Sequence, residues 1–504
     1  MEHIAPRRVS RRGLLQATGG VAAAAGLGAA TGGPAHAAAG DAGGVPRPGE
    51  WAADWRGGGS RAERPNIVFL IADDHRHDVL GAAGHPVVRT PHLDALAKRG
   101  TRLTAHHCGG GMTGAICAPS RAMVMTGREL FQATPGEIIY PDLPLLPEQL
   151  HEHGYHTFVT GKWHNGTASH HRAFGAGDGA RLFFGGMSDQ YAAPLRPFDP
   201  SGEYPASSIY YEDRHTTDLY ADAVVDFIKG YDDDAPFFAY AAFQSPHDPR
   251  MAPAPFSGLY SDKDVPLPEN FLPVHPFDNG QLSNRDENLT QRPRGKGTIR
   301  AHLADYYAMV SHLDHGVGRI LDALRKTGRA RNTIVVYTSD HGLGLGSHGL
   351  LGKQNLYEHA LRTPLIISGP GIPAGRTVDA LTQHRDLFPT LAGLAGAPVP
   401  DTVTGSDLLP VIERRAGRVH EYVHGAYMYW QRSVSDGRHK LIRYRPEKGT
   451  GSERTQLFDL AEDPHEMRDL ADSAAHRDVA ALLSEELVRW QAAVGDPAEP
   501  FTAP

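Results

Sequence analysis

The sequence predicts an α/β fold in which helices flank a mostly parallel central sheet, followed by a smaller C-terminal α+β subdomain on an antiparallel sheet. Short apolar runs bounded by polar residues, typical of buried parallel strands, alternate with helical patterns. This alternation favours a parallel sheet covered by helices. After about residue 415, the segment YVHGAYMYWQRSVSDGRHKLIRYRP alternates aromatic and polar residues, which is typical of antiparallel strands.

Five short apolar segments are the predicted strands of the central sheet. The first, NIVFLIADD at 66–74, ends in two acids. Four others share its pattern and are expected to be parallel strands as well: 157–160, 237–243, 333–340 and 364–368.

Three helices and one long loop are predicted around these strands. Thr90–Pro91 can cap and begin a helix that Gly100 ends. Apolar residues recur at spacings of three and four from Ile299 to Leu324, which indicates a long amphipathic helix. A closing helix is expected at 477–493. The segment 245–298 is rich in Pro and polar residues and is expected to be a functional loop.

The N-terminal residues have the features of an export signal. Arg11–Arg12 precede an apolar stretch at 21–30, and Ala35–Ala37 offers small residues for cleavage. This order resembles a twin-arginine signal, so we expect a periplasmic or extracellular protein. The alternative is a buried Ala-rich helix. The expected domains are a signal peptide at 1–38, a linker at 39–64, a main α/β domain at 65–415 and a C-terminal subdomain at 416–504.

Charge and composition exclude several classes of function. The formal net charge is −8, and loss of residues 1–38, with four Arg and one Glu, leaves about −11. A broad basic surface for nucleic acid is therefore not expected. After the N-terminus no apolar run is long enough to span a bilayer. Cys108 and Cys117 can in principle form one disulfide, but two cysteines do not indicate a disulfide scaffold.

Acidic side chains follow two of the predicted strands. Asp73 and Asp74 end one strand, and Asp340 and His341 end another. The carboxyl ends of parallel strands are where α/β proteins bind ligands. Adjacent acids there can converge on a hard cation such as Ca²⁺, which favours several oxygen ligands. Either pair alone is also compatible with solvated loop acids.

The segment ICAPSR at 116–121 combines a cysteine, a helix start and a cation. Pro119 suits the first turn of a helix, which places Cys117 at its N-terminus, where anions are favoured. Arg121 lies four residues on and can project on the same side. A thiolate at this position would be a nucleophile. The alternative is a buried structural cysteine, which is also the expectation for Cys108.

At this point the sequence resembles the formylglycine-dependent sulfatase family, which belongs to the alkaline phosphatase-like superfamily. The family signature C-x-P-S-R matches Cys117–Arg121. Further family blocks occur in family order over roughly residues 65–475: NIVFLIADD, TPHLDALAKRGTR, TGR, GKWH, SPH, SDHG, GK with YEHALRTPLII, and LFDLAEDPHEMRDLA.

The resemblance implies two cofactors. A formylglycine-generating enzyme would oxidise Cys117 to formylglycine before folding, so that twin-arginine export would carry a matured, folded protein. One calcium ion would bind at positions matching Asp73, Asp74, Asp340 and His341, with residue 117 approaching it. Many relatives carry Asn where this chain has His341, and a histidine nitrogen is a softer ligand than oxygen.

The resemblance also implies an activity and its catalytic residues. The expected reaction is hydrolysis of a sulfate ester to an alcohol and inorganic sulfate. Arg121 would hold the formylglycine hydrate and the sulfate. His247, alone or together with Lys353, would protonate the leaving oxygen, and His164 would accept a proton afterwards. The six expected catalytic residues are Cys117, Arg121, Lys162, His164, His247 and Lys353.

The substrate and two rival functions stay open at this stage. A sulfated carbohydrate is the first expectation, and an aryl or alkyl sulfate is the second. The rivals are a phosphonate or phosphate ester hydrolase of the same superfamily, and a noncatalytic sulfated-glycan binder if Cys117 is unmodified. His348 is either a substrate contact or structural. Packing within the subdomain is favoured over substrate stacking for Tyr427, Tyr429 and Trp430.

Overall fold

The computed structural model describes residues 64–501, and these belong to one compact unit of the chain. The expected signal peptide, and the expected linker apart from Arg64, lie outside the described residues. Within the described part, no helix is both long and apolar enough to cross a membrane. The expected domain boundary near residue 415 stays a prediction.

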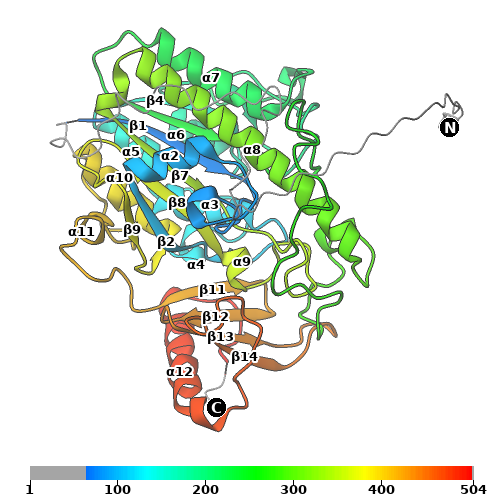
Figure 1. Ribbon diagram of the computed structural model, residues 1–504. Helices are drawn as coiled ribbons and strands as arrows, with labels where there is room; N and C mark the ends of the chain where they lie inside the picture. Colours follow the sequence, from blue (N-terminus) through cyan, green and yellow to red (C-terminus); the bar gives the residue numbers. More distant parts are fainter. Residues whose placement is uncertain (1–63, 502–504) are drawn as a thin grey trace, which may run out of the picture. The chain divides into compact units, whose positions relative to one another are not determined.

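A nine-stranded sheet forms the centre of the fold (Figure 1). Its order is β10-β2-β8-β7-β1-β6-β4-β5, and β9 pairs with β2. The bounds are β1 Asn66–Ala72, β2 Thr101–His107, β4 His156–Lys162, β5 Asp178–Phe183, β6 Phe237–Ala242, β7 Thr333–Ser339, β8 Arg362–Ser368, β9 Arg376–Val378 and β10 Thr382–Gln383.

Four of the five expected central strands are parallel neighbours, and the fifth corrects the prediction. Strand β1 pairs in parallel with both β6 and β7, and β6 pairs in parallel with β4. Strand β8, expected to be parallel, is antiparallel to β7 and β2. A buried apolar strand has the same pattern in either direction, so the sequence alone does not give its orientation.

Alternate side chains of β1 contribute to two cores on opposite faces of the sheet. Ile67 and Phe69 belong to one core with helices α3 Cys117–Thr126, α5 Leu146–Glu152, α6 Thr167–Phe174 and α10 Leu387–Ala395. Val68 and Leu70 belong to the other with α2 Pro91–Arg99, α7 Thr216–Gly230 and α8 Lys296–Lys326. This is the expected three-layer arrangement.

The predicted helices agree with the structure. Thr90 is at the N-cap position of α2, although its side chain makes no capping hydrogen bond, and Gly100 follows the end of the helix. Helix α8 includes the whole amphipathic pattern. Shorter helices are α4 Leu130–Ala133, α9 Glu358–Leu361 and α11 Leu409–Ile412. The 3₁₀ turns are Gly81–Ala83, Ala206–Ser208, Asp286–Leu289, Arg329–Asn332, His384–Asp386 and Ala474–His476.

A second sheet has the order β14-β13-β12-β11-β3. Its antiparallel strands are β11 Val423–Tyr427, β12 Gln431–Ser435, β13 His439–Tyr444 and β14 Arg454–Asp459, and α12 Arg477–Val494 follows them. Both features were predicted. The short strand β3, Gly110–Gly111, adds a parallel edge to β11 and comes six residues before α3.

The expected long loop is present between β6 and α8. It contains only the 3₁₀ turn Asp286–Leu289 among its described residues. The loop begins directly after β6, so residues at its start lie at the same edge of the sheet as the ends of β1 and β7. This edge is where the candidate site is found.

Candidate active site

The two acidic strand ends meet, as predicted. Ala72 and Ser339 are register partners at the ends of β1 and β7, so the residues after them lie side by side. The backbone N–H of Asp340 donates to the carbonyl of Ala72 at 3.1 Å, and the N–H of Asp74 donates to Asp340 Oδ1 at 3.2 Å. Asp74 has a φ of 70°, a conformation that is uncommon outside functional sites and turns.

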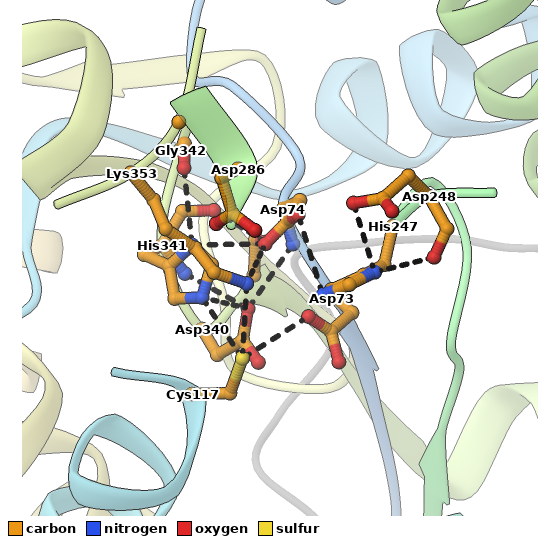
Figure 2. Close-up of polar contacts among 12 residues, drawn as sticks. Asp73, Asp74, Cys117, His247, Asp248, Asp286, Asp340, His341, Gly342 and Lys353 are labelled. Atoms are coloured by element: carbon orange, nitrogen blue, oxygen red, sulfur yellow. Dashed lines mark hydrogen bonds and ion pairs between the residues drawn. The ribbon is translucent and has the colours of Figure 1, made fainter. Parts of the chain in front are cut away.

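Cys117 is the first residue of α3 and lies between these strand ends (Figure 2). Its Sγ lies 3.4 Å from Asp73 Oδ1, 3.2 Å from His341 Nε2 and 3.3 Å from Lys353 Nζ. Complete burial, and then Asp73, raise the pKa of the thiol above its usual value. The unmodified side chain is therefore a protonated thiol and not the reactive thiolate that a helix N-terminus alone would favour.

Arg121 projects from the next turn of α3 onto two of the carboxylates. Its Nε and Nη2 donate to Asp340 Oδ2 at 3.1 and 3.0 Å, and Nη2 also lies 3.2 Å from Asp73 Oδ2. Nη1 donates to the carbonyl of Lys162 at 2.9 Å. The guanidinium is thus fixed by ionic contacts in a buried position.

Two lysines complete the charge balance of the site. Lys162 Nζ lies 2.5 Å from Asp73 Oδ2, and Lys353 Nζ lies 2.8 Å from Asp74 Oδ1. Burial alone would raise the pKa of Asp73, but Lys162 and other nearby cations hold it well below its usual value. The carboxylate of Asp73 therefore stays ionised, and three fixed cations stand near the acids of the site.

Lys162 reaches the site because β4 has a glycine just before it. Gly161 has a φ of 88°, and a Cβ there would lie 2.0 Å from the carbonyl of Ala242 on β6. Only glycine tolerates both conditions. The pairing of β4 with β5 shifts register at this point, between Thr160 and Gly161.

The two expected catalytic histidines contact different carboxylates. His247 Nδ1 is 2.6 Å from the carbonyl of Asp248, and its Nε2 is 3.9 Å from Asp74 Oδ2. His164 Nε2 is 3.9 Å from Glu137 Oε2, and its buried Nδ1 makes no hydrogen bond. Burial first, and then Lys162, lower the pKa of His164 to about 2.

The donor atoms at this edge of the sheet fit a metal ion. Two sets of side chains are candidates, and within each set all the ligand atoms lie within 4.8 Å of one another. The first set is Asp73, Cys117, Asp340 and His341, and the second is Asp73, Asp74, Cys117 and His247. The two sets share residues and mark one site. Three of the six residues in the two sets are aspartates, and their carboxylate oxygens suit a hard cation. His341 Nδ1 lies 3.1 Å from Asp74 Oδ1, so its ring is also among the ligand candidates.

Several uncertain residues lie away from this site. The ring of His348 stacks on Tyr357 with 4.0 Å between centroids, and its Nε2 lies 3.1 Å from Asn270 Nδ2, so the contacts of His348 are structural. Cys108 is buried and unpaired with Cys117. Tyr427 is buried and Trp430 packs against the same apolar cluster, as favoured, whereas Tyr429 is 41% exposed.

Sequence reasoning missed residues that contact the predicted ones. Ser120 Oγ donates to the carbonyl of Asp340 at 2.5 Å and lies 2.8 Å from His384 Nδ1, which links α3 to the residue that follows β7. Glu137 faces His164. Three more, Asp248, Arg285 and Asp286, form an ion-paired group beside His247. Asp248 and Ser120 adjoin predicted residues, but the others have no signal in the sequence.

The chain matches known proteins over most of its length. A model of the sulfatase family matches residues 65–397, and a model of the N-sulphoglucosamine sulphohydrolase C-terminal region matches residues 346–493. The chain is 28% identical over 464 residues to an arylsulfatase of Clostridium perfringens, which is 84% of this chain and 94% of that protein.

Two solved structures share the fold. One is a protein in complex with its substrate D-glucosamine-2-N,6-O-disulfate, with a TM-score of 0.72, 24% identity, and coverage of 87% of this chain and 99% of that chain. The other is a phosphonate monoester hydrolase of Agrobacterium radiobacter, with a TM-score of 0.69, 22% identity, and coverage of 86% and 96%. With the sulfatase model matching more than half of its residues, this chain belongs to the sulfatase family of the alkaline phosphatase-like superfamily and is a sulfuric ester hydrolase.

Proposed function

We propose that this enzyme hydrolyses the sulfate ester of a carbohydrate with a formylglycine made from Cys117 and one bound calcium ion. The observation that carries the proposal is the position of residue 117. Its side chain lies within 3.4 Å of a carboxylate, an imidazole and an ammonium group at the edge of the sheet. An oxygen nucleophile at this position would be next to both the metal ligands and the cations that suit a sulfate.

The metal ligands in this proposal are Asp73, Asp74, Asp340 and His341, together with residue 117. Bound there, calcium would stabilise negative charge on the sulfuryl oxygens, and hydrated formylglycine would supply the attacking hydroxyl. The donor set supports calcium over a pair of zinc ions, because three of its five residues are aspartates, which offer hard carboxylate oxygens.

The fixed cations of the site would bind the sulfate. Arg121 is held rigidly by Asp73 and Asp340, and Lys162 and Lys353 are held by carboxylates. Such preorganised groups need little rearrangement when charge develops in the transition state. Burial makes their electrostatic effect larger than it would be in water.

The two histidines would transfer protons at different steps of the reaction. The carbonyl of Asp248 only accepts hydrogen bonds, so His247 holds an N–H at Nδ1 and exchanges its mobile proton at Nε2. This proton would go to the leaving oxygen. Burial and then Lys162 lower the pKa of His164, so its ring is neutral and has a lone pair for a proton after the ester bond breaks, but the low pKa also makes it a weak base.

Maturation and export are part of the same proposal. A formylglycine-generating enzyme would act on Cys117 before folding, and the expected twin-arginine signal would then carry the folded protein to the periplasm or the exterior. The sequence of residues 1–38 supports this order.

The proposed substrate class is tested by a sulfate-release screen over defined sulfated glycans, with aryl and alkyl sulfates and phosphonate monoesters alongside. The relative solved with D-glucosamine-2-N,6-O-disulfate supports a carbohydrate. The phosphonate monoester hydrolase of the same fold makes phosphorus esters the second candidate. Faster turnover of phosphonate esters than of every sulfate ester would overturn the proposed specificity.

The proposed modification is tested by tryptic mass spectrometry of protein made with a formylglycine-generating enzyme. The peptide containing residue 117 is expected to be lighter than the cysteine form by about 18 Da, with a hydrated form beside it, whereas ordinary oxidation of a thiol adds mass. Protein made without that enzyme is the control. Highly active protein with a wholly unmodified thiol would contradict the formylglycine mechanism, and a thiol in inactive protein that binds sulfated glycans would favour the binding function.

A further inference from the structure

Two buried acids and one arginine form an ion-paired group in the long loop. Arg285 Nη2 contacts Asp248 Oδ2, and Nη1 donates to Asp248 Oδ1 at 3.1 Å and to Asp286 Oδ1 at 2.8 Å. Both acid side chains are 9% exposed, whereas the side chain of Arg285 is 45% exposed. We call these three residues the loop triad. The guanidinium is its accessible part.

The loop triad contacts one residue of the proposed site, His247, and the neighbour of another, Lys353. Asp248 follows His247 and accepts its Nδ1–H through the backbone carbonyl. Asp286 Oδ2 accepts a hydrogen bond from Gln354 Nε2 at 2.8 Å, and Gln354 follows Lys353. Figure 2 shows Asp248 on the side of His247 that faces away from Asp74, and Asp286 next to Lys353.

We propose that the loop triad binds neutral hydroxyl groups of the leaving alcohol, so that the enzyme selects esters of uncharged polyols over esters with a second anionic group beside the sulfate. The inference rests on the proposed sulfate ester hydrolysis and adds the character of the alcohol. A hydroxyl both donates and accepts hydrogen bonds, and the triad offers carboxylate oxygens as acceptors and a half-exposed guanidinium as donor.

The charge of the triad argues against an anionic neighbour. One guanidinium faces two carboxylates, so the group has a net charge of −1 when all three are ionised. Burial is the largest single effect on the pKa of Asp248 and raises it, but the hydrogen bonds with Arg285 and the nearby positive charges together lower it to about 2, so this carboxyl is ionised. An arginine without such partners would bind a carboxylate or second sulfate in a bidentate manner, but here both Nη atoms already contact acids.

The test compares two esters whose alcohols are similarly basic, so that both need the same help from a proton donor. Propyl sulfate has no hydroxyl group, and the glucose and galactose 6-sulfates carry several. The values of kcat and KM are measured for matured wild-type enzyme and for Arg285→Ala and Arg285→Lys. The Lys variant keeps a cation between the acids if the Ala variant fails to fold. Arg292→Ala, which changes an exposed arginine of the same loop, is the control.

The loss of kcat/KM on the sugar sulfates is expected to exceed the loss on propyl sulfate by about 10- to 100-fold, mainly through KM, because hydrogen bonds to a charged group are removed. Arg292→Ala is expected to change neither. Equal losses on both esters would overturn the inference, because the triad would then only position His247 and Lys353. Wild-type preference for sugars with an adjacent second sulfate or carboxylate would also overturn it. Failure of the proposed sulfate ester hydrolysis would give a different result, because the wild-type enzyme would then release sulfate from neither ester.

Discussion

The carboxylate of Asp73 contacts three side chains from two separate elements, α3 and β4. Arg121 comes from α3, Lys162 from the end of β4, and the Cys117 side chain from the first residue of α3. Each of these side chains is at least 44 positions away from Asp73 in the sequence, so the contacts depend on the tertiary fold. At the residue scale, the site is therefore a set of ionisable side chains whose pKa values depend on one another.

Replacement of Asp340 by alanine is expected to remove both the calcium ion and turnover. The change deletes a hard oxygen ligand and one charge, and it leaves Arg121 without its closest acid. We expect calcium binding to weaken by well over about 100-fold, more than the loss of an outer hydrogen-bond partner causes. Calorimetry with calcium and metal analysis measure this, with the exposed Asp379→Ala as control. Calcium retained in the variant would contradict the ligand role, and two zinc ions per chain would favour a phosphatase-type site.

Replacement of His247 by alanine is expected to separate proton donation from sulfate binding. A sugar alkoxide is a strong base and leaves poorly without a proton, whereas a nitrophenolate is a weak base. We expect kcat/KM to fall by about 10²–10⁴-fold on a sugar sulfate and much less on nitrophenyl sulfate.

Two other variants complete the comparison. Arg121→Ala is expected to harm both substrates, because it acts on charge common to both transition states. The exposed His151→Ala is expected to change neither. Equal losses for the two leaving groups in His247→Ala would assign His247 to binding or structure.

At the scale of elements, apolar patterns predicted where strands and helices lie but not how they pair. The ends of β1 and β7 could be matched from their acids, because parallel strands end at one edge. The reversed direction of β8 could not, since its apolar run fits either orientation. Likewise, nothing in the loop 245–298 indicates that Arg285 returns to Asp248, a contact over 37 positions. Short motifs reveal single residues, whereas loop contacts depend on the tertiary fold.

Gly110 joins the second sheet to the active-site helix, and its replacement by alanine is expected to destabilise the protein. Its φ is 79°, and a Cβ there would lie 2.1 Å from the carbonyl of Ala426 on β11. We expect a loss of more than about 1 kcal/mol in the free energy of unfolding. Denaturant unfolding measures this, with Gly114→Ala as control, because a Cβ at Gly114 has open space. Equal stability of the two variants would show that the β3–β11 pairing does not constrain this glycine.

At the scale of the whole molecule, a buried ionic group joins the two sheets. Glu358 begins α9, just before β8 of the central sheet, and Lys440 lies on β13 of the second sheet with its Nζ 2.8 Å from Glu358 Oε1. Glu466, after β14, lies 2.9 Å from the same ammonium and accepts the backbone N–H of Glu358. His107 on β2 contacts Glu358 at 3.2 Å. This group fixes α9 five residues after Lys353, so the C-terminal strands support the catalytic edge.

Replacement of Lys440 by methionine is therefore expected to destabilise the protein more as the pH rises. Burial raises the pKa of Glu358, but Lys440 holds it well below its usual value in the wild type. Without Lys440, burial dominates, and the folded variant binds a proton that the unfolded chain releases above about pH 4.5. Stability then falls with pH, at most by about 1.4 kcal/mol per unit. The pKa of Glu466 is already raised to about 7, mainly by burial, so its contribution has the same sign and is lost as the pH rises through that value.

The measurement is the free energy of unfolding of the wild type and of Lys440→Met at pH 5.5 and pH 8. We expect the variant to lose up to about 3 kcal/mol more free energy of unfolding at pH 8 than at pH 5.5. Folding requires the buried carboxyl of the variant to be protonated, and protonation costs more free energy as the proton concentration falls. Lys448→Met is the matched control, since that lysine side chain is 88% exposed and its loss should be small at both pH values. A loss that does not depend on pH would mean that Lys440 stabilises the joined sheets by packing its aliphatic chain and not by neutralising Glu358.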